Sequence, residues 1–197
     1  MALRIGLLGA GRIGKVHASA IGATEGAVLT AVADAFPDAA AGVAAAHGAD
    51  VASIDDILAD RDIDAVFITT PTDMHADLII RSAHAGKAIF CEKPIDLDVA
   101  RVTECLSAVA TTSTTLMVGF NRRFDPNFRA VRDRIDAGDI GAVEMVVITS
   151  RDPGPPSRVH GTVRRTAARH DHPRSRHGAL PPRRGAHRGV RRRLSPR

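Results

Sequence analysis

One stretch near the N-terminus decides the fold: Leu3-Arg4-Ile5-Gly6-Leu7-Leu8-Gly9-Ala10-Gly11-Arg12-Ile13-Gly14. An apolar run of strand length leads into three glycines spaced Gly-x-Gly-x-x-Gly, and a helix-compatible segment follows at residues 15–20. In this spacing Gly9 forms the tight turn, Gly11 admits a pyrophosphate close to the backbone, and Gly14 packs the helix on the strand. The free N–H groups at the helix start attract phosphate charge. The stretch therefore predicts a strand, turn and helix that bind a dinucleotide.

An acidic residue stands at the distance that this motif requires. Residues 28–33 are apolar and typical of a second strand, and Asp34 follows them directly. A carboxylate in this place accepts hydrogen bonds from the adenosine ribose and repels a 2′-phosphate. We therefore expect NAD as the cofactor rather than NADP. The alternative is that Asp34 caps the next helix.

Strands and helices alternate as far as residue 118, which predicts an α/β fold, a Rossmann-type doubly wound parallel sheet. The expected helices span residues 37–47, 54–59, 73–85 and 99–110, and the further strands span residues 64–69, 88–91 and 114–118. Gly48 ends the first of these helices, and Ser53 caps the second. Groups that bind ligands gather beyond the carboxyl ends of such strands. We therefore expect one site where the strands end, at residues 9–14, 34, 70–72, 92–94 and 119–123.

Composition divides the chain unevenly. The net charge is +5, but residues 157–197 hold 13 of the 27 Lys and Arg residues and a single acid, Asp171. The first 156 residues carry 14 basic and 21 acidic residues, a net charge of −7. The two cysteines fit a reducing compartment, and neither a signal peptide nor an apolar run of membrane-spanning length is present, so we expect a cytoplasmic protein without a membrane partner.

The expected domains follow from these patterns. Residues 1–120 form the NAD-binding Rossmann domain, residues 121–156 begin a truncated α+β domain for substrate binding and oligomerisation, and residues 157–197 form a basic, disordered tail. In the second part we expect a helix at 127–136 and a strand at 142–149. A strand that has lost its neighbours exposes an unpaired edge, which predicts association or poor solubility.

Four motifs together resemble the Gfo/Idh/MocA oxidoreductase family: Gly9 to Gly14, Thr69-Thr70-Pro71, Glu92-Lys93-Pro94, and Gly119-Phe120-Asn121-Arg122-Arg123-Phe124-Asp125-Pro126. The continuation at residues 148–156 is most similar to the inositol 2-dehydrogenase branch. The resemblance implies hydride transfer between NAD and a ring hydroxyl of a cyclitol or sugar. It also implies that Lys93 is catalytic, holding the substrate hydroxyl and tuning the proton relay, and that Glu92 contacts the nicotinamide ribose.

Pattern and resemblance together give an expected cofactor site without a metal: Gly9, Gly11, Arg12, Ile13, Gly14, Asp34, Thr70, Pro71, His75, Glu92, Lys93, Asn121 and Arg123. Plainer interpretations stay open for several of them. Lys93 is alternatively a solvated loop lysine, Arg12 a surface side chain, and His75 a structural group satisfied by its neighbours.

The tail lacks a string that the family would place in the second domain, S-G-G-x-x-R-D-M-T-I-H-D, which carries a catalytic Asp and His. Residues 169–174 are nevertheless compatible with R-D-M-T-I-H-D translated in a shifted frame. We therefore favour a frameshift near Pro156, with NAD binding weak at best, turnover near background, and the family's oligomer lost. The alternatives are a nucleotide-binding remnant without catalysis and, less favoured, a basic arm that binds nucleic acid.

Overall fold

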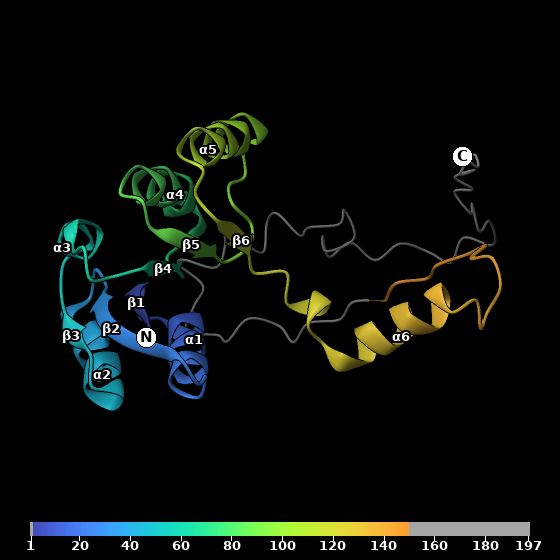
Figure 1. Ribbon diagram of the computed structural model, residues 1–197, viewed down its shortest axis with the longest axis horizontal. Coiled ribbons are helices and arrows are strands. Elements are labelled where there is room, and N and C mark those ends of the chain that lie inside the picture. Colours follow the sequence, from blue (N-terminus) through green and yellow to red (C-terminus); the bar gives the residue numbers. More distant parts are fainter. Residues whose placement is uncertain (1, 150–197) are drawn as a thin grey trace, which may run out of the picture. The chain divides into compact units, whose positions relative to one another are not determined.

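The computed structural model describes residues 2–149, so the frameshift and the nucleic-acid arm, which concern residues 157–197, lie outside the described part. Six parallel strands form one sheet in the order β3-β2-β1-β4-β5-β6 (Figure 1). The strands are β1 (Leu3–Leu8), β2 (Ala27–Ala33), β3 (Asp50–Val51), β4 (Ala65–Ile68), β5 (Ala88–Cys91) and β6 (Leu116–Val118). This order confirms the predicted Rossmann-type sheet.

The chain enters the sheet at its centre. From β1 it moves outward through β2 and β3, then returns to the other side of β1 and moves outward again through β4, β5 and β6. The connections therefore diverge between β1 and β4, and ligands of such sheets bind in the crevice beyond the carboxyl ends of the strands at this point. The glycine turn after β1 and the loop after β4 flank it.

The helices are α1 (Arg12–Gly22), α2 (Pro37–His47), α3 (Ile54–Ala59), α4 (His75–His84), α5 (Val99–Thr112) and α6 (Pro126–Asp136), with short 3-10 helices η1 (Thr72–Met74) and η2 (Asn121–Arg123). Figure 1 shows α1 and α2 on one face of the sheet and α4 and α5 on the other. The segment predicted as one helix at 73–85 consists of the 3-10 helix η1 followed by α4.

Each face of the sheet has its own core. In β1 the side chains of Ile5 and Leu7 pack with α1 and α2, whereas Leu8 packs with α3, α4 and α5. This alternation is the period of two of a strand buried on both faces. Gly6 lies on the α3 side, where an added Cβ would stand 2.5 Å from a methyl carbon of Ile57. The lack of a side chain at residue 6 lets α3 approach β1.

Local signals that the sequence offered at the helix ends are present. Ser53 caps α3 in a capping box with Asp56, and Asp98 accepts a hydrogen bond from the N–H of Ala100 at the start of α5. Gly48 ends α2 in the left-handed conformation, with φ +66°. These contacts fix the ends of helices that would otherwise leave backbone groups without partners.

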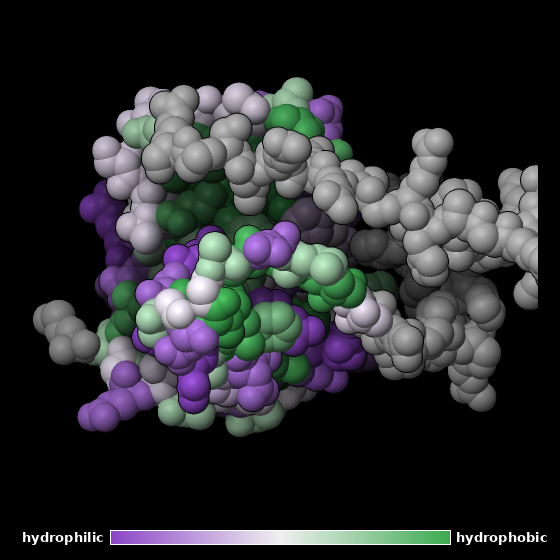
Figure 2. Space-filling model, turned by 90° about the vertical axis from the view of Figure 1, so that its right-hand side faces the viewer, coloured by the Kyte–Doolittle hydropathy of each residue, from purple (hydrophilic) through white to green (hydrophobic). Residues whose placement is uncertain are grey.

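The strand expected at residues 142–149 is wrong: this segment has no strand structure. A strand needs a partner for its N–H and C=O groups, and all strands of the described part belong to the sheet above. Large apolar side chains in this segment are exposed: Val143, Met145, Val146, Val147 and Ile148. Figure 2 shows hydrophobic residues at the surface on the face that it presents. Such exposure favours association, which stays a prediction.

Within residues 2–149, no helix has the length and apolar character needed to cross a membrane.

Candidate functional site

The three glycines of the turn differ in the space around them. Gly9 has φ +105°, and a Cβ there would lie 2.8 Å from the backbone of Thr69 and Thr70. A Cβ at Gly14 would lie 2.0 Å from the carbonyl oxygen of Gly9, so α1 packs directly on the turn. Gly11 faces open space, with nothing within 4 Å of an added Cβ. The turn therefore leaves room on its outer side at the one glycine expected to face a pyrophosphate.

The start of α1 is suited to an anion. Gly11 is its N-cap residue and offers no side-chain cap, so the N–H groups of the first turn receive no capping oxygen from that position. Such groups carry the positive end of the helix dipole. Arg12 is exposed and Ile13 half-buried in this turn. The uncapped turn and the space beside Gly11 fit the pyrophosphate of a dinucleotide.

Asp34 is held by the same turn. Its Oδ2 accepts a hydrogen bond from the N–H of Ala10 at 2.6 Å, and its Oδ1 accepts one from the N–H of Phe36 at 2.8 Å. Each carboxylate oxygen keeps a second lone pair that can accept a hydroxyl. Asp34 does not cap α2, whose N-cap residue is Phe36. The structure thus removes the capping alternative and leaves an oriented carboxylate beside the glycine turn.

The loop after β4 faces the glycine turn. Thr69 Oγ1 donates a hydrogen bond to the carbonyl of Gly9 at 2.7 Å. Thr70 Oγ1 is buried without a hydrogen-bond partner in the described structure, which is costly for a hydroxyl. Pro71 follows as the exposed N-cap residue of η1. A buried hydroxyl that lacks a partner in this loop is a second feature that fits a polar ligand.

His75 joins this loop to the next one. It is 2 % exposed, and its Nε2 and Nδ1 each lie 2.8 Å from a backbone oxygen, those of Thr70 and Pro94 respectively. Both ring nitrogens therefore face backbone carbonyl oxygens, and at least one of them donates a hydrogen bond. The plainer interpretation of His75 as a satisfied structural group fits this geometry, and any effect on a ligand passes through the two loops that it connects.

The segment after β5 contains Glu92 and Lys93, for which the family resemblance predicts a cofactor contact and a catalytic role. Lys93 is exposed, and the peptide bond between Lys93 and Pro94 is cis. Glu92 is folded inward, and its Oε1 lies 2.8 Å from Nε2 of His17 on α1. The sequence interpretation did not single out His17, although its position three residues after Gly14 places it one turn further along the same side of α1.

Cys91, at the end of β5, is not a nucleophile. Burial raises the pKa of its thiol to about 12, and the negative charge of Glu92 adds to this effect. The thiol is therefore protonated near neutral pH, and the thiolate is the reactive form.

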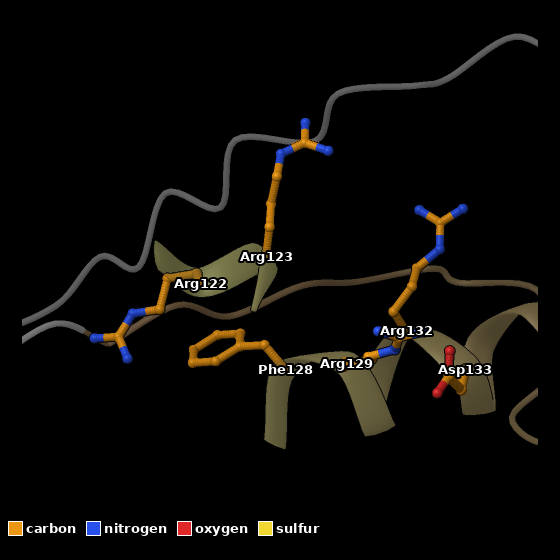
Figure 3. Close-up of a pocket in the computed structure, with 6 residues that line it drawn as sticks. All are labelled: Arg122, Arg123, Phe128, Arg129, Arg132 and Asp133. Atoms are coloured by element: carbon orange, nitrogen blue, oxygen red, sulfur yellow. The ribbon is translucent and has the colours of Figure 1, made fainter. Parts of the chain in front are cut away.

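The remaining expected residues lie in η2, directly after Gly119. Asn121 and Arg123 are both exposed. Figure 3 shows a nearby pocket in which the guanidinium groups of Arg122 and Arg123 point apart; its lining is Arg122, Arg123, Phe128, Arg129, Arg132 and Asp133. Arg122 lies over the ring of Phe128, with 5.0 Å to its centroid, and Arg132 pairs with Asp136 at 2.6 Å. These arginines do not converge on a common point. In residues 2–149 no group of three or more His, Cys, Asp or Glu residues is arranged to hold a metal ion.

A family model described as "Oxidoreductase family, NAD-binding Rossmann fold" (GFO_IDH_MocA) matches residues 3–120. The chain belongs to this family. The match includes the glycine turn, Asp34 and the segment after β5, and it confirms the predicted resemblance and NAD as the family's cofactor.

Similar proteins of this oxidoreductase family carry inositol in their names. Inositol 2-dehydrogenase of Rhizobium meliloti (strain 1021) is 66 % identical over 156 residues, which cover 79 % of this chain and 47 % of that protein. A crystal structure from Sinorhizobium meliloti 1021, described as a myo-inositol dehydrogenase, superposes with a TM-score of 0.77 at 65 % identity and covers 80 % of this chain and 48 % of that one. The crystal structure of scyllo-inositol dehydrogenase from Lactobacillus casei, solved with NAD(H) and scyllo-inositol, superposes with a TM-score of 0.69 at 33 % identity. The match covers 73 % of this chain and 44 % of that one. The chain thus spans about half the length of the relatives it matches.

Proposed function

We propose that this chain is the NAD-binding part of an oxidoreductase of the inositol 2-dehydrogenase type, which transfers hydride from a CH–OH group of a cyclitol or sugar to NAD. One observation carries the proposal: the uncapped start of α1, open at Gly11, stands beside the oriented carboxylate of Asp34. The 66 % identity to an inositol 2-dehydrogenase supports the substrate class.

Each part of the site has a distinct task in this proposal. The N–H groups around Arg12 and Ile13 hold the pyrophosphate, and Asp34 accepts hydrogen bonds from the adenosine ribose. The hydroxyl of Thr70, buried without a partner, gains one from the ligand. The remaining expected residues either contact the cofactor or hold the loops that do: Gly9, Gly14, Pro71, His75, Asn121 and Arg123.

The reacting end lies after β5. Bound NAD supplies the hydride acceptor at this end. Glu92 would contact the nicotinamide ribose, and Lys93, exposed at the strand end, would hold the substrate hydroxyl and tune the relay that removes its proton. Positioning of the cyclitol ring against these groups contributes a large part of the rate.

The domain division belongs to the same proposal: residues 1–120 bind NAD, residues 121–156 begin the substrate domain, and residues 157–197 are an out-of-frame tail. In this proposal the out-of-frame tail replaces the family string with the catalytic Asp and His, so we expect NAD binding that is weak at best and turnover near background. Both cysteines are buried and free of disulfides, which supports a cytoplasmic location.

The experiment is to resequence the gene around the codons for Pro155, Pro156 and Ser157, and to assay both reading frames. We expect an extra or missing base at these codons. We also expect the protein translated from the restored frame to form NADH with myo- or scyllo-inositol. A clean sequence would refute the frameshift. A restored or related full-length protein that reduces NAD with none of the cyclitols or sugars tested would refute the substrate class.

A further inference from the structure

His17 and Glu92 connect two parts of the site that are far apart in the sequence. His17 lies on α1, whose first turn forms the proposed pyrophosphate site, and Glu92 lies next to Lys93. Nε2 of His17 is 2.8 Å from Oε1 of Glu92, and the two side chains are only 18 % and 22 % exposed. A carboxylate accepts hydrogen bonds but cannot donate them, so Nε2 carries the proton in this pair.

An aromatic support fixes the imidazole. Its ring centroid lies 4.9 Å from that of Phe90 and 5.7 Å from that of Phe67. Phe67 and Phe90 are paired across β4 and β5 and stack at 4.6 Å. The ring of His17 therefore rests on two strands of the sheet. Little rotational freedom is left for it to lose when it holds Glu92.

The carboxylate of Glu92 has further neighbours on its other sides. Its Oε2 accepts a hydrogen bond from the backbone N–H of Lys93 at 3.3 Å. A Cβ added at Gly119 would stand 3.2 Å from Oε1, so the end of β6 leaves just enough space for this rotamer. The imidazole, the Lys93 amide and the gap at Gly119 together select one position for the carboxylate.

We propose that His17 is a positioning residue that fixes Glu92, and through it the backbone of Lys93, at the end of the site where hydride is transferred. The inference rests on the proposed function, since the position of Glu92 matters there through the nicotinamide half of NAD. It also explains why the half-buried histidine of α1 holds the carboxylate of Glu92. A purely structural role predicts that any aromatic ring would serve equally well at residue 17.

Two variants separate hydrogen bonding from packing. His17→Phe keeps an aromatic ring against Phe67 and Phe90 but removes the donor, whereas His17→Gln restores a donor without the ring. The matched control is His84→Gln, on the exposed side of α4. Each protein is titrated with NADH and with ADP, which lacks the nicotinamide half, and thermal unfolding is recorded alongside.

We expect His17→Phe to weaken NADH binding about tenfold, the loss of one hydrogen bond to a charged group, with ADP affinity changed by less than about twofold. His17→Gln and His84→Gln should stay within about threefold of wild type for both ligands. Equal NADH affinity in wild type and His17→Phe, or equal losses for NADH and ADP, would overturn the inference. A folded wild type that binds neither NADH nor ADP would instead overturn the proposed function.

A measurement without any ligand tests the pair itself. In nitrogen-15 NMR spectra the wild type should show a protonated Nε2 on His17 whose proton exchanges slowly with water. Glu92→Ala should speed this exchange at least tenfold and leave His84 unchanged. The same exchange rate for His17 in both proteins would refute the contact on which the inference stands.

Discussion

Replacing Gly14 by alanine tests how the glycine turn is built. The added Cβ would lie 2.0 Å from the carbonyl oxygen of Gly9, 3.0 Å from its carbonyl carbon and 3.1 Å from Oγ1 of Thr69. Ordinary contacts begin at about 3.4 Å, so α1 must move away from the carbonyl of Gly9 by roughly 1.4 Å because backbone atoms cannot yield as a flexible side chain would.

The size of the effect follows from this clash. Overpacking in a close-packed interior costs about 1–3 kcal/mol of unfolding free energy. In a chain of this length each kcal/mol lowers the melting temperature by about 2–4 °C. Gly14→Ala should therefore melt roughly 2–12 °C below wild type in a thermal scan followed by circular dichroism. Its NADH affinity should fall by more than about tenfold, since the shift displaces the N–H groups at the start of α1.

Gly11→Ala is the matched control in the same turn. Gly11 has φ −69°, which alanine adopts without strain, and its Cβ meets nothing within 4 Å. This variant should keep its stability to within about 1 kcal/mol and still lose NADH binding, because the methyl group fills the space of the pyrophosphate. A Gly14→Ala protein with the same melting temperature as the wild type would contradict this explanation of the turn, as would a Gly11→Ala protein that binds NADH with normal affinity.

Three further predictions follow from single contacts. Asp34→Asn should weaken NADH binding about tenfold and narrow the preference for NADH over NADPH, because a carboxylate that repels the 2′-phosphate is lost; parallel titrations measure both. Thr70→Val should leave the melting temperature unchanged or raise it, since the buried hydroxyl has no partner, yet weaken NADH binding several-fold. The pKa of the Cys91 thiol is raised from 9.0 to about 12, so the folded protein holds this proton more tightly than the unfolded chain. That contribution to stability is intact below pH 9 and is lost as the pH rises toward 12. The melting temperature should therefore fall more steeply with pH above pH 9 in wild type than in Cys91→Ala. Equal slopes of melting temperature against pH in the two proteins would contradict this.

Local signals explain why most of the sheet and its helices could be predicted. Residues 37–47 were expected to be helical with these bounds because they are rich in alanine and Gly48 follows them; in the structure Gly48 ends the helix in the left-handed conformation. The short strand β3 escaped prediction since two residues, Asp50 and Val51, carry no periodicity. The strand at 142–149 was wrong for the opposite reason: its alternation is clear, but a strand forms only against a partner.

Some residues of the candidate site could be predicted from the sequence, and others could not. The glycine turn and Asp34 follow a fixed spacing along the chain, so the sequence was sufficient to expect them. The pair of His17 and Glu92 joins residues 75 positions apart, and only the sheet order brings α1 beside the end of β5. The double engagement of His75 by two backbone oxygens likewise depends on loops that meet in space.

We propose that this chain forms an NAD site at the carboxyl edge of its sheet. The most direct test is a calorimetric titration of the folded chain with NADH, and with NADPH for comparison. We expect saturable binding of NADH, at least about tenfold tighter than the binding of NADPH, and loss of NADH binding in Gly11→Ala. A folded wild type that takes up no NADH, or that binds NADPH as tightly, would contradict it.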